Sequence, residues 1–168
     1  MFEEKRVPDR QVRAAQTETT VRVYQSCPPA VADVALEKQA LEQGRPLALV
    51  PSFRLAAHLS GYGSEPGHER ILAVDLTRAG FEGALAHAHI EWAPERDLDH
   101  TPLNFQAIRL SLRGEAVDEW ITAITDVTPV MRDISGLLAT DQLHKAVKLV
   151  PHEPPYPLSE DLAKAVGA

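Results

Sequence analysis

Polar side chains that could hold a ligand occur within an apolar run near the start of the chain. Arg22 and Gln25 lie in the β-branched stretch 20–25, which Pro28 and Pro29 terminate. Residues three apart on a strand point to opposite faces, and open sheets tend to bind ligands where their strands end. A ligand pocket is one interpretation of this stretch, and an ordinary edge strand with solvated polar side chains is the other.

A second group of polar residues follows the apolar run that ends at Trp92. Glu95, Arg96 and Asp97 come directly after Pro94. A carboxylate held at a strand end beside an aromatic side chain could stabilise a developing cation, as sugar-transfer chemistry requires. The alternative is a charged turn in which Arg96 neutralises both neighbouring carboxylates, and the residues alone favour this alternative.

Two other groups have chemically competent side chains. His87 and His89 could share a face, with His100 or Asp97 adding ligands, but zinc needs three or four converging ligands and nothing in the spacing fixes the third. Cys27 could be a nucleophile at the end of the first strand, but a lone cysteine is more often a small buried apolar group. We predict neither a metal site nor a catalytic cysteine.

The composition narrows the class of protein. The 168 residues suffice for one domain, the single cysteine excludes an internal disulfide, and no apolar run approaches the roughly 18 residues that favour a membrane span. The net charge is −7 and the basic residues are scattered, which disfavours nucleic-acid binding except as a reaction acceptor. We expect a cytoplasmic protein whose partner is a small molecule, with no membrane contact; the oligomeric state is not indicated.

Hydrophobic periodicity predicts a single α+β domain of short elements. We expect a mobile arm at 1–16, a globular region at 17–158 and a tail at 159–168. The expected strands are 21–25, 46–50, 70–76, 89–92, 105–112 and 121–127, and the expected helices are 30–44, 54–59, a short one at 81–86, and one or two in 129–149. Gly44 is expected to cap the first helix, and the glycine-rich stretch 61–67 is expected to form a loop beside the ligand.

Eight motifs in order resemble a bacterial family catalogued as domain of unknown function 4291, and the resemblance spans Arg10 to Leu158. The motifs are Arg10-x-Val12-Arg13-Ala14, Val21-Arg22-Val23-Tyr24-Gln25, Pro51-Ser52-Phe53, Glu69-Arg70-Ile71-Leu72-Ala73, Trp92-x-Pro94-Glu95-Arg96-Asp97, Gly114-Glu115-Ala116-Val117, Ile124-Thr125-Asp126-Val127-Thr128 and Tyr156-Pro157-Leu158. The family implies no activity. Its usual Trp-Ile-Lys-Pro-Ser-Phe run is replaced here by Leu49-Val50-Pro51-Ser52-Phe53, so the ligand is expected to differ from that of typical members, or a catalytic role to have been lost.

The layout of the first three strands also resembles ADP-ribosyltransferase-like domains, which implies a mixed sheet core with short helices. Gln25 stands where those domains have a histidine, Ser52 falls on their second position, and Glu95 is the nearest acidic residue for the third. The Gln25 amide can hydrogen-bond a ribose hydroxyl but cannot become charged. The resemblance implies NAD as a co-substrate and no metal.

The same resemblance implies a set of roles around one cleft bordered by the 61–67 loop. Glu95 and Gln25 are the expected catalytic residues, and the expected binding residues are Arg22 for a pyrophosphate, Ser52 for the ribose, Tyr24, Tyr62 and Trp92 for stacking, and the neighbouring Arg54 and Arg96. The predicted function is ribosyl transfer or hydrolysis. A tailoring enzyme acting on a non-nucleotide molecule in the same pocket and a non-catalytic binding module are the alternatives.

Overall fold

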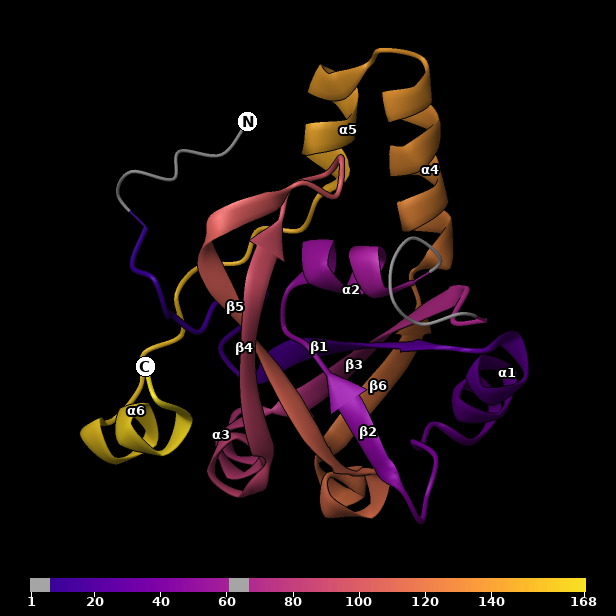
Figure 1. Ribbon diagram of the computed structural model, residues 1–168. Coiled ribbons are helices and arrows are strands. Elements are labelled where there is room, and N and C mark those ends of the chain that lie inside the picture. Colours follow the sequence, from indigo (N-terminus) through magenta and orange to yellow (C-terminus); the bar gives the residue numbers. More distant parts are fainter. Residues whose placement is uncertain (1–6, 61–66) are drawn as a thin grey trace.

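The structure, a computed structural model, describes residues 7–60 and 67–168 (Figure 1). Its strands are β1 (Thr20–Cys27), β2 (Pro46–Leu49), β3 (Arg70–Thr77), β4 (His89–Arg96), β5 (Pro102–Arg113) and β6 (Ile121–Asp126). Its α-helices are α1 (Pro29–Lys38), α2 (Phe53–Leu59), α3 (Arg78–His87), α4 (Thr128–Ala139), α5 (Leu143–Leu149) and α6 (Glu160–Val166). Two 3-10 turns, Gly114–Ala116 and Asp118–Trp120, separate β5 from β6.

The strands form two three-stranded sheets with the orders β1-β3-β6 and β2-β5-β4. The strands of the two sheets cross in Figure 1, and a bridge between Tyr24 and Val50, with hydrogen bonds of 2.7 and 3.0 Å, joins them. A single α+β domain is therefore confirmed. All the pairings within both sheets are antiparallel, which corrects the expected mixed sheet.

The central strand β3 is buried on both of its faces. Leu72 and Val74 belong to the core that contains residues of both sheets, whereas Ile71 and Ala73 pack in a second core with α2 and α4. All four side chains are fully inaccessible. The prediction that this strand is among the least accessible segments is confirmed, because an unbroken apolar run suits a strand covered on both sides.

Helix α2 begins directly after Ser52, as predicted. Ser52 has an extended backbone and its Oγ accepts a hydrogen bond from the Leu55 backbone N–H at 3.0 Å, which caps the helix. Helix α1, by contrast, ends at Lys38 with Gln39 in the left-handed conformation at φ 53°, so the prediction that Gly44 caps it is wrong. Gln39 can take this conformation because its amide hydrogen-bonds both the Leu36 carbonyl and the β6 backbone.

Residues 10–16, which were expected to belong to a mobile arm, pack onto the domain. Val12 and Ala14 are fully buried, and their segment pairs with residues 150–157, here called the strap. The Ala14 N–H donates to the Pro154 carbonyl at 3.1 Å, and the Tyr156 N–H donates to that of Val12 at 2.8 Å. Residues 10–16 therefore belong to the fold because their alternate side chains fill the core.

The helical hairpin formed by α4 and α5 rises above α2 (Figure 1), and Met131, Ile134 and Ala146 join the second core. One or two helices were predicted here, and two are present. In the stretches 7–60 and 67–168, no helix combines the length and apolar character needed to cross a membrane.

Candidate active site

Glu95 lies near the end of β4 and is held by two hydrogen bonds to the same oxygen. The Ser52 hydroxyl donates to Oε1 at 2.8 Å and the Arg96 backbone N–H donates to it at 2.9 Å. Only 8% of the residue is exposed. Burial raises the pKa of the Glu95 carboxyl, while the two hydrogen bonds and the charges of Arg54 and Arg13 act in the opposite direction. The carboxylate is thus fixed in orientation by donors that carry no charge.

A second carboxyl, that of Glu153, faces the same region from the strap. Its Oε2 accepts a hydrogen bond of 2.9 Å from the Phe53 backbone N–H, in the first turn of α2. Burial of the carboxyl and, to a smaller extent, the charge of Glu95 raise the pKa of Glu153 to about 8. At neutral pH this carboxyl therefore carries a proton in most molecules, whereas two ionised carboxylates would repel each other.

A cavity of about 410 Å³ connects these groups. Its polar walls are formed by Glu95, Glu153, His152, Arg54 and Arg13, and its apolar walls by Phe105, Val147, Val150, Pro151, Pro154 and Pro155. This volume lies within the range of small-molecule sites, which are commonly apolar with a few convergent polar groups. The cavity lies between α2, β4 and β5 on one side and the two chain-end segments on the other.

The structure brings Ser52, Glu95 and Arg54 together, but it engages Arg22 elsewhere. The Arg22 guanidinium donates two hydrogen bonds to Asp75 on β3, of 2.8 Å from Nε and 3.1 Å from Nη2. The charge of Arg22 is thus already neutralised by a neighbouring strand. Arg22 is therefore not among the residues that line this cavity, and its role at a pyrophosphate stays a prediction.

Tyr24 and Gln25 are also outside the cavity. The Tyr24 ring is buried in the second core, edge-on to Phe53 with centroids 5.5 Å apart, and burial raises its pKa. Gln25 lies on the opposite face of β1 and is 4% exposed, and its Oε1 finds no hydrogen-bond partner among the described residues. The predicted convergence of four residues on one cleft therefore fails, because β1 alternates its side chains between two cores.

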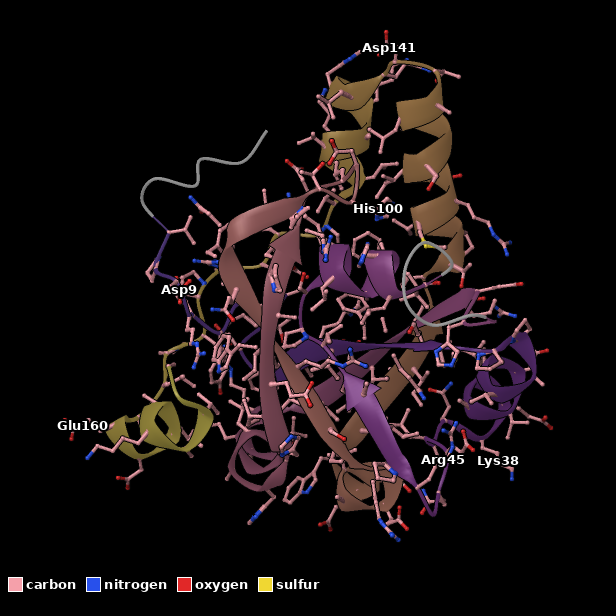
Figure 2. All side chains as sticks on the ribbon, viewed as in Figure 1. Asp9, Lys38, Arg45, His100, Asp141 and Glu160 are labelled. Atoms are coloured by element: carbon pink, nitrogen blue, oxygen red, sulfur yellow. The ribbon has the colours of Figure 1, made fainter. Side chains whose placement is uncertain are left out.

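The remaining predicted binding residues lie at other places. The Trp92 Nε1 donates to the Val166 carbonyl at 2.7 Å, so this indole anchors α6 and does not line the cavity. Arg96 Nη1 donates to the His100 carbonyl at 3.1 Å and so holds the β4–β5 turn beside α2, where Figure 2 labels His100. Tyr62 and most of the expected ligand-covering loop lie outside the described residues.

The other groups considered from sequence are separated. Burial raises the pKa of the Cys27 thiol to about 12, so the thiol is a poor nucleophile. His87 ends α3 whereas His89 begins β4, and no group of three or more metal-binding side chains occurs in the part of the chain that the structure describes. The basic residues Lys38 and Arg45 lie at the far end of the molecule from His100 (Figure 2).

Nine of the eleven cavity residues are absent from the predicted set, among them Arg13, Phe105 and Glu153. Arg13 lies in the segment interpreted as an arm, although the small apolar residues on either side of it are spaced as in a strand. Glu153 lies in the proline-rich stretch Pro151–Pro157, where no periodicity marks a site. A single acidic residue among prolines was a usable signal, because a rigid extended segment can place one carboxyl.

Comparison with known families gives one match. The sequence model of the family described as Domain of unknown function (DUF4291) matches residues 11–91 and 86–156, which together span most of the chain. No curated protein and no solved structure matches the chain. The matched ranges include Arg13, Ser52, Glu95 and Glu153, so the cavity residues lie within the part of the chain that the family model covers.

Proposed function

The chain belongs to the DUF4291 family, and we propose that it is an enzyme that binds NAD or a related nucleotide and transfers or hydrolyses its ribosyl group. The observation that carries this proposal is the pair of carboxyls, Glu95 and Glu153, that face one cavity of about 410 Å³. Cleavage of glycosidic bonds commonly uses two carboxyls whose surroundings give them different protonation states.

In this proposal Glu95 acts on the developing cation. The bond between the ribose C1′ and the leaving group breaks, and its electron pair departs with the leaving group. Positive charge then grows on the sugar, and a carboxylate whose position is already fixed by Ser52 and the Arg96 N–H stabilises it without reorganising. Water or an acceptor hydroxyl adds to C1′ and loses its proton to a carboxylate.

Glu153 acts as the proton donor where the leaving group needs a proton. A neutral base or an oxygen leaving group accepts the proton that Glu153 carries at neutral pH. The nicotinamide of NAD leaves as a neutral molecule and needs no proton. The rates of release from the two kinds of substrate should therefore depend differently on Glu153. Substitution of this residue can thus identify which kind of leaving group the enzyme releases.

The test measures release of the base from NAD and from nucleoside monophosphates by the purified full chain and by two variants. Glu95→Gln should abolish release from any substrate, whereas Glu153→Gln should impair release only of bases that leave with a proton. Glu91→Gln, on the same strand but with 61% of its side chain exposed, is the matched control and should leave the rate unchanged.

Binding is measured separately by thermal shift and calorimetry. A ligand at one hundred times its Kd adds about 2.7 kcal/mol to the free energy of unfolding, which a shift assay detects. Stabilisation by a nucleotide with no base release from any substrate tested would reject the enzyme and leave a binding module. Stabilisation by no nucleotide, together with no release, would reject the nucleotide proposal as a whole.

A tailoring enzyme for a non-nucleotide molecule is the second candidate. The observation in its favour is the apolar part of the cavity lining, which includes Phe105, Val147 and Val150. Such a wall accepts many flat or aliphatic groups without selecting a base. Stabilisation by anionic aromatic compounds but not by nucleotides would favour this candidate.

A further inference from the structure

Arg13 is a cavity residue whose guanidinium is held by few contacts within the protein. It comes from the buried segment that pairs with the strap, and its guanidinium lies over the Phe105 ring with 5.0 Å between the Cζ and the ring centroid. This stacking fixes the plane of the guanidinium and leaves its edges open. A fixed, planar donor group is what recognition of a carboxylate or phosphate requires.

Arg13 forms fewer hydrogen bonds within the protein than its guanidinium can donate. Its Nη2 donates to Gln11 Oε1 at 2.7 Å, and within residues 7–60 and 67–168 its guanidinium forms no ion pair within 4.0 Å. None of its nitrogen atoms is among the buried side-chain atoms that lack a partner in the described residues, so its remaining N–H groups are solvent-accessible, and the residue lines the cavity. An arginine carries five N–H donors, and most of these are available to a ligand.

Charge favours an anion at this point. Burial lowers the pKa of Arg13, and the charge of Glu95 acts in the opposite direction without fully compensating. Arg54 lines the same cavity, while Glu153 is mostly neutral at pH 7. The cavity is thus lined by two basic side chains, and an anionic ligand group would interact favourably with the guanidinium of Arg13.

We propose that the Arg13 guanidinium, stacked on Phe105 at the cavity wall, binds a phosphate group of the nucleotide substrate. This inference rests on the proposed function for the identity of the ligand. The proposed phosphate contact is therefore Arg13 of the segment 10–16, and not Arg22, whose guanidinium is hydrogen-bonded to Asp75. The substrate class becomes a phosphorylated ribosyl compound, with the phosphate at Arg13 and the scissile bond near Glu95.

The experiment compares AMP with adenosine, and inorganic phosphate alone, by calorimetry at fixed ionic strength. Wild type should bind AMP more tightly than adenosine, and Arg13→Gln should weaken AMP binding by about 10- to 100-fold while leaving adenosine binding unchanged. Arg13→Lys keeps the charge but loses the planar fork, and should give an intermediate loss.

Arg10→Gln is the matched control. Arg10 lies three residues before Arg13 in the same extended segment and is stacked on another aromatic ring, that of Trp92 at 5.7 Å, but it does not line the cavity. Its substitution should leave both affinities unchanged. Thermal unfolding of each variant shows whether it is folded, and the Lys variant provides the test where the Gln variant is not.

Equal affinity of wild type for AMP and adenosine would overturn the inference, as would an equal loss of both ligands in the Arg13 variants. Binding of inorganic phosphate that survives Arg13→Gln would also overturn it. These outcomes are independent of turnover. If base release depends on Glu95 but the affinity for AMP does not change in the Arg13 variants, this inference alone is rejected. If wild type releases no base but still binds AMP more tightly than adenosine, and this difference depends on Arg13, only the proposed chemistry is rejected.

Discussion

Two clusters of ionisable residues in this protein differ in the hydrogen-bond partners of their side chains. On β1 and β3, Arg22 and Asp75 neutralise each other through two hydrogen bonds, and 32% and 19% of their side chains remain exposed. In the cavity, Glu95 and Glu153 receive hydrogen bonds from a hydroxyl and from backbone N–H groups. A charge that is oriented by neutral donors remains available to a ligand, whereas a charge paired within the protein does not.

The largest expected effect is on turnover, in the cavity cluster. Glu95→Gln should lower the rate of base release by about 100- to 1,000-fold and leave ligand affinity nearly unchanged, because the lost charge acts mainly in the transition state. Initial rates and calorimetric Kd values for the same preparation test this. An equal loss of affinity and rate would make Glu95 a binding residue.

The next effect is a pH dependence of stability caused by Glu153. Its pKa is about 8 in the folded protein against an ordinary 4.5, so the stabilisation by the proton is complete below pH 4.5 and is lost as the pH rises through 8. The free energy of unfolding should fall by up to about 1.4 kcal/mol per pH unit across this window. Urea denaturation at several pH values measures the slope.

Glu153→Gln should flatten this pH dependence and make the protein more stable than wild type at and above pH 8. The amide keeps the shape of the protonated carboxyl but has no proton to lose. Glu18→Gln, at an exposed position, is the control and should retain the wild-type slope. A slope unchanged by Glu153→Gln would show that the proton is held elsewhere.

A smaller effect is expected at Ser52, which connects the cavity to the helix. Ser52→Ala removes the cap of α2 and a hydrogen bond to Glu95, and should cost about 0.5 to 2 kcal/mol of stability. It should also raise the pKa of Glu95 and shift the acid limb of the pH–rate profile upward. Ser52→Thr should restore both properties; a stability loss with an unmoved limb would limit Ser52 to capping.

The smallest effect is expected at the self-neutralised pair. A double-mutant cycle of Arg22→Ala and Asp75→Ala should give a coupling energy of no more than about 1 kcal/mol, because both side chains are partly exposed. Nucleotide affinity and turnover should not change. A tenfold loss of AMP affinity in Arg22→Ala would contradict the distinction drawn between the two clusters.

Local sequence signals predict the elements that local interactions determine. The strand 70–76, the helix that starts at Ser52 and the helical pair in 129–149 follow from apolar runs and a capping residue. The proximity of Ser52 and Glu95 came from a family resemblance, and the hydrogen bond between them agrees with it. Arg54, another of the predicted binding residues, also lines the cavity.

The parts that could not be predicted depend on contacts between distant residues. Arg13 pairs with Pro155, and neither segment is long or periodic enough to indicate a strand by itself. The choice of Gln39 over Gly44 as the end of α1 depends on a hydrogen bond to β6. The side chains of the candidates Arg22 and Tyr24 contact residues distant in sequence, Asp75 on β3 and Phe53 in α2 respectively.

The pairing of residues 10–16 with the strap also bears on when the cavity can form. During synthesis the chain leaves the ribosome from its N-terminus, so Arg13 emerges long before Glu153 and Pro155. Residues 10–16 therefore cannot pair with the strap until the rest of the chain has been synthesised. The contact between these two segments, which completes the cavity, is one of the last to form. A nascent chain released before residue 150 would lack the second carboxyl and six of the eleven lining residues, and so would have no complete cavity.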